Sequence, residues 1–152
     1  AVGEVNVTTR MKECGCIIGG EGNGGVIYPA LHYGRDAMAG VALFLTNLAY
    51  KNIKVSELLA TYPKYVIAKN KIELSDSALI DRILEEVKSV YASEDINTID
   101  GVKISFEDRK EWVHLRRSNT EPIIRIYAEA ATKEAADALA QQIIDIAESI
   151  IK

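Results

Sequence analysis

The chain has few cysteines, few prolines and no long apolar segment. Its two cysteines, Cys14 and Cys16, are too few and too close together for a disulfide scaffold, which is typical of a protein from a reducing compartment. The longest uncharged apolar stretch, residues 37–50, falls short of the roughly 20 residues that cross a bilayer. The first ten residues show no secretory signal. The sequence therefore predicts a cytoplasmic protein without a membrane partner.

An excess of positive charge is also lacking. The 18 Lys and Arg residues are outnumbered by 22 Asp and Glu, which gives a formal net charge of −4 and a sequence pI near 5.3. No general attraction to nucleic acid is expected from this balance. With 48% hydrophobic and 26% charged residues, the composition is typical of a globular protein. Its 152 residues suffice for one ordinary domain or two small ones.

Residues 1–62 are expected to form an incomplete α/β unit. Alternating valines predict a strand over residues 2–7, and a brief buried strand is expected at residues 16–18. A glycine-rich loop follows, after which Asp36 is expected to cap a helix. The apolar face of that helix is predicted to contain Val41, Phe44, Leu45 and Leu48. Because the chain starts without Met in a strand-like stretch, we expect that it was cut from a longer polypeptide.

Residues 63–152 are expected to form an α+β domain of the order β-α-β-β-β-α, with both helices on one face of a mostly antiparallel sheet. Strands are predicted over residues 65–72, 102–106, 112–116 and 123–128. Ser75 or Asp76 is expected to cap one helix, and Thr132 the other. The helical apolar faces are predicted to contain Leu79, Ile83, Val87 and Val90 in the first helix, and Leu139, Ile143, Ile146 and Ile150 in the second.

The segment GGEGNGG, residues 19–25, is the first candidate site. It contains the G-x-G-x-x-G pattern of dinucleotide-binding proteins, in which a helix opens at the glycines. Pro29 and Gly34 delay any helix until about Asp36, which argues against a nucleotide-dependent oxidoreductase. Two interpretations remain. The segment is a plain surface loop, or a ligand approaches its backbone while Glu21 and Asn23 face hydroxyl groups.

The segment RRSNTEP, residues 116–122, is the second candidate, with Arg125 three residues further on. Guanidinium groups make paired hydrogen bonds to phosphate oxygens, and hydroxyl groups and turn amides satisfy the remaining lone pairs. The alternative is a Ser/Asn turn between two strands, with solvated arginines beside Glu121. The chemistry of the segment favours phosphate binding.

No metal site is predicted. Cys14 and Cys16 with His32 lack a fourth ligand for zinc, so we expect buried free thiols. Residues 95–101 resemble a calcium loop only faintly and are expected to form a plain turn before a strand. His114 alternates with apolar residues and is interpreted as a strand residue.

The two candidate loops together resemble those of one enzyme family. GGEGNGG followed by HYGRDA resembles the sugar-binding loop of the α-D-phosphohexomutases, which include phosphoglucomutase, phosphomannomutase and phosphoglucosamine mutase. LRRSNTEPIIRIYAEA resembles the phosphate-binding loop of the last domain of that family. The resemblance extends from Gly3 to the end of the chain.

The resemblance implies a four-domain enzyme. This chain would be the end of the third, α/β domain (residues 1–62) and the whole fourth domain (residues 63–152), which is TATA-binding-protein-like. Glu21 and Asn23 would bind the sugar, and Arg35 falls where relatives can place a basic residue near the substrate. The phosphate-binding residues would be Arg116, Ser118, Asn119 and Thr120, with Arg125 nearby. Gly25 stands where other members often carry His.

The family's reaction moves phosphate between the anomeric and terminal oxygens of a hexose through a bisphosphorylated sugar, using a phosphoserine and Mg²⁺. Neither the phosphoserine motif nor the aspartate-rich metal loop is found in this sequence, so no catalytic residue is expected in the chain and Mg²⁺ is expected outside it. The resemblance implies the substrate-recognition half of the enzyme, inactive alone. Its expected partners are a phosphosugar and the missing N-terminal domains. The alternative is a stand-alone phosphosugar-binding module.

Overall fold

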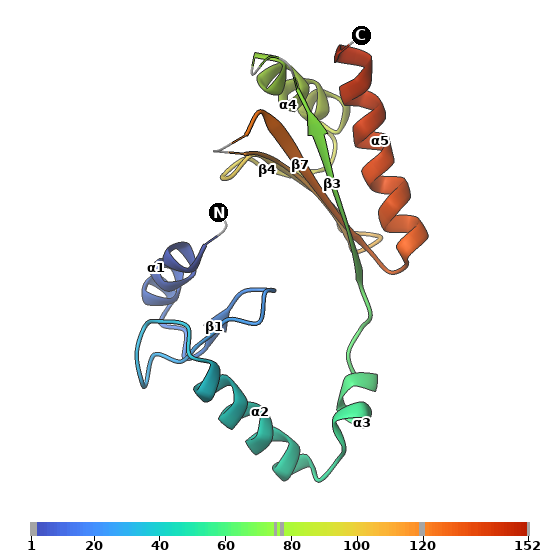
Figure 1. Ribbon diagram of the computed structural model, residues 1–152. Helices are drawn as coiled ribbons and strands as arrows, with labels where there is room; N and C mark the ends of the chain where they lie inside the picture. Colours follow the sequence, from blue (N-terminus) through green and yellow to red (C-terminus); the bar gives the residue numbers. More distant parts are fainter. Residues whose placement is uncertain (1–2, 75, 77, 119–120, 152) are drawn as a thin grey trace. The chain divides into compact units, whose positions relative to one another are not determined.

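The computed structural model divides into two compact units, Ala1–Pro63 and Lys64–Lys152 (Figure 1). It describes residues 3–74, 76, 78–118 and 121–151. Within the described residues, no helix has both the length and the apolar character needed to cross a membrane.

The first unit contains three helices and one small β-hairpin. The elements are α1 (Glu4–Cys14), β1 (Gly19–Gly20), β2 (Val26–Ile27), α2 (Ala37–Lys51) and α3 (Val55–Ala60). β1 and β2 are antiparallel neighbours. The buried apolar side chains described in this unit are Met11, Ile27, Ala39 and Leu58. This is too little apolar burial for a complete domain core.

Two of the strand predictions for this unit are wrong. A helix, α1, covers most of the segment 2–7, with Glu4 in its first turn and Lys12 in its last. Both charges complement the helix dipole, and the valine alternation was too short to outweigh them. No strand covers residues 16–18; β1 begins at Gly19, and the side chains of Ile17 and Ile18 are exposed.

Helix α2 confirms the expected cap but not the expected burial. The Asp36 carboxylate accepts a hydrogen bond from the backbone N–H of Ala39 at 2.9 Å, which satisfies one of the free amides at the helix start. The side chains of Val41, Phe44 and Leu45 are 42–56% exposed, although they were expected to be buried. The described part of this unit has only two two-residue strands, which are too small to cover the helix face.

The second unit is a five-stranded antiparallel sheet with two helices. The sheet order is β3-β7-β6-β5-β4, with β3 (Val66–Glu73), β4 (Asp95–Asn97), β5 (Val102–Phe106), β6 (Glu111–Arg117) and β7 (Ile123–Ala130). The helices are α4 (Ala78–Val90) and α5 (Lys133–Ile151). The expected α+β fold is confirmed. The short edge strand β4 lies in the segment that was expected to be a plain turn, and it pairs with β5.

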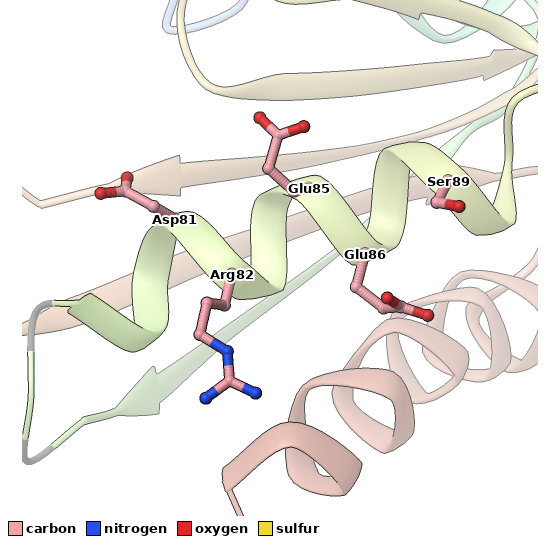
Figure 2. A pocket seen from close by; sticks show the side chains of 5 residues that line it. All are labelled: Asp81, Arg82, Glu85, Glu86 and Ser89. Carbon is pink, nitrogen blue, oxygen red and sulfur yellow. The ribbon is translucent and has the colours of Figure 1, made fainter.

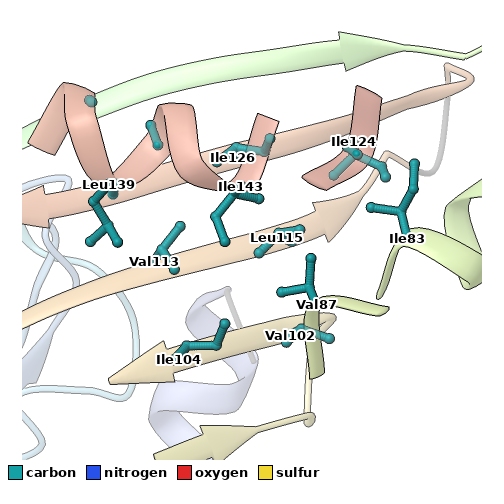
Figure 3. Close-up of a cluster of buried hydrophobic side chains, with 14 of the residues drawn as sticks. Ile83, Val87, Val102, Ile104, Val113, Leu115, Ile124, Ile126, Leu139 and Ile143 are labelled. Atoms are coloured by element: carbon teal, nitrogen blue, oxygen red, sulfur yellow. The ribbon is translucent and has the colours of Figure 1, made fainter. Parts of the chain in front are cut away.

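Both helices pack on the same face of this sheet, and Figure 3 shows the buried side chains between the helices and the sheet. Ile83 from α4 and Leu139 and Ile143 from α5 are buried there with strand residues such as Ile104 and Leu115. Leu79 and Ile146 pack against the same cluster, so the core expected for the two helices is confirmed.

The helix ends agree in part with the expectation. The hydroxyl of Thr132 accepts a hydrogen bond from the Ala135 amide at 3.2 Å, as a helix cap does. The Asp76 carboxylate accepts one from Ala78 at 2.9 Å, while Ser75, the alternative cap, lies outside the described residues. Val90 is 53% exposed, in contrast to its expected place on the buried face of α4.

Candidate functional site

The first candidate site is the hairpin loop between β1 and β2, residues 21–25. The N–H of Gly24 donates to the carbonyl of Glu21 at 3.1 Å, and the N–H of Glu21 donates to the carbonyl of Gly25 at 3.1 Å. Gly24 has φ +88°, a conformation that L side chains rarely adopt. Glycine at this position therefore allows a tight turn, and no helix opens at the glycines.

The Glu21 carboxylate is held by a donor on each oxygen. The backbone N–H of Gly3 donates to its Oε1 at 3.1 Å, and the side-chain amide of Asn23 donates to its Oε2 at 3.3 Å. The Asn23 Oδ1 accepts from the N–H of Gly25 at 2.9 Å, which is an Asx-type turn contact. These bonds orient the carboxylate and the amide, the two groups expected to face sugar hydroxyls.

Arg35 lies against the same loop. Its Nε donates to the Glu4 carboxylate at 2.7 Å, and its backbone N–H donates to the other Glu4 oxygen at 3.2 Å. A Cβ on Gly25 would lie 2.8 Å from Cδ of Arg35 and 3.1 Å from Oδ1 of Asn23. The structure therefore brings Glu21, Asn23 and Arg35 together around one hairpin, and the Arg35 stem occupies the space beside Gly25.

Sequence reasoning missed Glu4. It was assigned to a strand, whereas the structure places it in the first turn of α1, where it forms an ion pair with Arg35 at 2.7 Å. The two residues are 31 positions apart, and no local pattern joins them. An acidic residue directly after a glycine was the available signal, since acidic residues favour the first turn of a helix.

The second candidate site lies on the sheet of the second unit. Arg116 on β6 is directly opposite Arg125 on β7, and Arg125 is opposite Lys71 on β3. Residues next to them in sequence, such as Leu115 and Ile126, are buried under the helices. Because successive strand side chains point to opposite faces, this row of three cations lies on the face that the helices leave uncovered.

Such a row is electrostatically unfavourable by itself. Directly opposite residues on antiparallel strands have Cβ atoms about 4.5–5.5 Å apart, and like charges there destabilise the sheet. Within the described residues, the Arg125 side chain has no hydrogen bond or ion pair, whereas Lys71 pairs with Glu73 at 2.7 Å. A bound anion between the two guanidinium groups would relieve their repulsion.

Arg116 has one acidic partner, which comes from the turn between β4 and β5. Its Nε donates to Oδ1 of Asp100 at 3.0 Å, and both side chains are less than one-third exposed. The backbone carbonyl of Asp100 also contacts the ring of His114, the neighbour of Arg116 on the same face. With Nε engaged, the two terminal nitrogens of Arg116 remain as a fork of the kind that binds carboxylate or phosphate oxygens.

The loop between β6 and β7 is described only in part. The N–H of Ser118 donates to the carbonyl of Ile123 at 3.0 Å, which closes the hairpin beside Arg116. The N–H of Leu74 donates to the carbonyl of Pro122 at 2.9 Å, so the end of β3 also holds the loop. Asn119 and Thr120 lie outside the described residues, and their predicted role stays a prediction.

Three further features bear on ligand chemistry. Across the described residues, no three His, Cys, Asp or Glu side chains gather as a metal ion requires. Cys14 and Cys16 are exposed free thiols, in contrast to the expected burial. A shallow depression on α4 is lined by Asp81, Glu85, Glu86, Arg82 and Ser89 (Figure 2). Its three carboxylates would repel a phosphate, so it does not compete with the sheet face.

Comparisons with known proteins show the family of the chain. Residues 1–65 match the family described as phosphoglucomutase/phosphomannomutase, alpha/beta/alpha domain III, and residues 52–146 match its C-terminal domain. The chain is 37% identical over 149 residues to a phosphoglucosamine/phosphogalactosamine mutase of Sulfurisphaera tokodaii, covering 97% of this chain and 32% of the relative. It is 38% identical over 154 residues to a phosphoglucomutase/phosphomannomutase of Thermococcus kodakarensis, covering 99% and 33%.

A solved structure shares the fold. A phosphoglucomutase/phosphomannomutase family protein of Burkholderia thailandensis superposes with a TM-score of 0.72 at 23% identity, covering 98% of this chain and 31% of that one. The chain therefore belongs to the phosphoglucomutase/phosphomannomutase family, as its two loops indicated. It spans about a third of the length of the relatives that it matches.

Proposed function

We propose that this chain is the substrate-recognition half of a phosphohexomutase, which interconverts hexose 1-phosphate and hexose 6-phosphate through a bisphosphorylated sugar. The observation that carries the proposal is the opposed pair Arg116 and Arg125 on the uncovered sheet face. The two guanidinium groups, of which only Arg116 has a recorded acidic partner, form a binding place for an anion with several oxygens. The relatives are named as mutases of hexosamine phosphates or hexose phosphates, and these names support a phosphosugar as the ligand.

The two loops would divide the substrate between them. Arg116, Arg125 and Ser118, with Asn119 and Thr120, would hold the phosphate that is not reacting. The Glu21 carboxylate and the Asn23 amide would bind sugar hydroxyls, and Arg35 would add a positive charge beside them. Binding energy from these contacts would then place the reacting oxygen at a phosphoserine in the missing N-terminal domains.

Mg²⁺ is not assigned to this chain. Among the described residues, no three His, Cys, Asp or Glu side chains gather where they could hold a metal ion. In the parent enzyme the ion would supply charge neutralisation for phosphoryl transfer, from residues outside this chain. We therefore expect the chain alone to bind phosphosugar without turning it over.

Amide NMR on the full chain tests the proposal. Titration with glucose 6-phosphate is expected to shift amides near Arg116, Ser118 and Arg125, and more weakly those near Glu21. Inorganic phosphate is expected to shift only the first group, and glucose without phosphate should leave that group unchanged. Affinity should be weak, with a Kd of about 1 mM, since that corresponds to only about 4 kcal/mol and the complete site is closed by further domains.

Three outcomes would contradict this function. Shifts confined to α4 or to other parts of the surface would contradict the assignment of the phosphate site to the uncovered sheet face. Mutase turnover by the purified chain would show that it contains more than recognition. A Kd of about 1 μM for glucose 6-phosphate would favour the alternative, a stand-alone phosphosugar-binding module, because a partial site cannot be expected to bind so tightly.

A further inference from the structure

The first unit contains a pair of thiols that the proposed function does not use. Sγ of Cys14 and Sγ of Cys16 are 3.0 Å apart, and both cysteines are exposed and free. A disulfide bond is about 2.05 Å long, so the two sulfur atoms need to approach by only about 1 Å to bond. Such a close pair of thiols differs from the single free cysteine that is buried in an ordinary protein core.

The end of helix α1 creates this contact. Gly15, between the two cysteines, has φ +64° and ends the helix in the left-handed conformation. The N–H of Cys16 then donates back to the carbonyl of Met11 at 3.1 Å, which turns the chain onto the last helical turn. The buried Met11 side chain lies where a Cβ on Gly19 would be, so this turn packs directly onto β1. The thiol contact is therefore a product of the folded turn.

The two thiols interact with each other and with a nearby arginine. The pKa of Arg10 is raised, chiefly by its hydrogen bond to Glu13 and then by attraction to the Cys14 thiolate. The pKa of Cys16 is raised, first by the hydrogen bond to Cys14 and then by repulsion between the two thiolates. The raised pKa keeps Cys16 in the thiol form at neutral pH, and a thiolate is the form that attacks a disulfide. The reactivity of the pair is therefore expected to come from the closeness of the two sulfur atoms and to rise with pH.

We propose that Cys14 and Cys16 form a thiol–disulfide exchange site whose substrates are small-molecule disulfides. In the first step one cysteine thiolate attacks a sulfur of the disulfide RSSR, the S–S bond breaks, and a thiolate leaves and takes up the proton that the cysteine lost. In the second step the other cysteine, as a thiolate, attacks the mixed disulfide, forms the Cys14–Cys16 bond and releases the second thiol. Two protein thiols are oxidised, and RSSR is reduced to two RSH.

The site lies at one end of the helix whose other end contacts the sugar-binding loop. The N–H of Gly3 donates to Glu21, and Glu4 forms an ion pair with Arg35, both at the start of α1. The Cys14–Cys16 turn leads within three residues into β1, which precedes Glu21. A Cys14–Cys16 disulfide would fix the turn at Gly15, through which α1 leads to the strand that precedes that loop.

The test is an equilibration of the full chain with a fixed concentration of reduced glutathione and several concentrations of oxidised glutathione, because each protein disulfide formed releases two reduced glutathione molecules. Free thiols are then blocked by alkylation, and the products are identified by mass. The expected product is a chain lighter by about 2 Da, the loss of two hydrogens. We expect the native chain to form it at a ratio of oxidised to reduced glutathione about tenfold lower than the urea-unfolded chain does, because the fold brings the thiols together.

Variants distinguish the effect of the fold on disulfide formation from the effect of the two cysteines being close in sequence. Cys14→Ser and Cys16→Ser should each form only a mixed disulfide with glutathione. Gly15→Asn should retain the parent's equilibrium constant within about threefold, since Asn tolerates the left-handed conformation, whereas Gly15→Val should lower it about tenfold. Equal equilibrium constants in native and urea-unfolded chains, or in the Gly15→Val variant and the parent, would overturn the proposal. Mixed disulfides on both cysteines as the main product of the native chain would do the same.

Discussion

The replacement Arg116→Lys tests the candidate phosphate site most directly. In the structure, Nε of Arg116 is engaged by Asp100 at 3.0 Å, so its two terminal nitrogens form the part that a phosphate would contact. Lysine retains the positive charge, but it has one nitrogen and no planar fork. The change therefore removes a hydrogen bond and the orienting contact with Asp100, while the net charge of the chain stays the same.

The expected loss follows from the energy of one charge-assisted hydrogen bond. Such a bond contributes about 1.5–3 kcal/mol, and each 1.4 kcal/mol changes an equilibrium constant about tenfold. The Arg116 side chain is 31% exposed, so water competes for its donors and the lower end of the range applies. We expect the Kd for glucose 6-phosphate to rise about tenfold. Ser118→Ala removes a neutral donor and should cost less, about 0.5–1.5 kcal/mol.

The assay is the NMR titration of the full chain with glucose 6-phosphate, repeated for each variant. Arg117→Lys is the matched control, because Arg117 is an exposed arginine one position further along β6 and so faces the other side of the sheet. Its Kd should stay within about twofold of the parent's, well below the tenfold step of one strong bond. A Kd for Arg116→Lys that equals the parent's, or an equal loss in Arg117→Lys, would refute the reasoning.

Three further predictions concern the folded structure. Gly101→Ala should lower the free energy of unfolding of the second unit by about 2 kcal/mol or more, because Gly101 has φ +81° and an added Cβ would collide with the backbone of β6. Ile143→Ala, at a fully buried core position, should lower the same free energy by about 2–5 kcal/mol in urea unfolding. The pKa of Asp36 is lowered from its ordinary value of 3.8, first by the Ala39 amide and then by His32. Its stabilising effect on α2 is therefore complete above pH 3.8 and is lost as the pH falls through the lowered pKa.

Each of these has a simple check. Ser105→Ala, on the uncovered face of β5, should leave the free energy of unfolding within about 0.5 kcal/mol of the parent's, unlike Gly101→Ala or Ile143→Ala. An NMR titration of the Asp36 carboxyl carbon should give a midpoint below 3.8, and Asp36→Asn should abolish the acid-dependent loss of protection at the start of α2. A midpoint at or above 3.8 would contradict the assigned hydrogen bonds.

The fold of the second unit was predictable to a large extent from its sequence. Helices α4 and α5 have apolar residues at helical spacing over three turns or more, and β5, β6 and β7 alternate between buried and outward residues. These periodicities follow from local backbone geometry. The edge strand β4 was missed because three residues are too few to show a period. Helix α1 was missed because its terminal charges and its glycine end outweighed a short alternation of valines.

The sequence by itself determined the family and the residue types of both loops, since motif spacing and charge can be read directly along the chain. Only the tertiary structure decided which of those groups meet. Strand register places Arg116 opposite Arg125, and a one-residue slip would have put them on different faces. Contacts over long sequence separations, such as Glu4 with Arg35, depend on how the turns close, and the left-handed turn at Gly15 decided that two thiols touch. A linear pattern specifies neither register nor closure, because both depend on packing between segments that are distant in the chain.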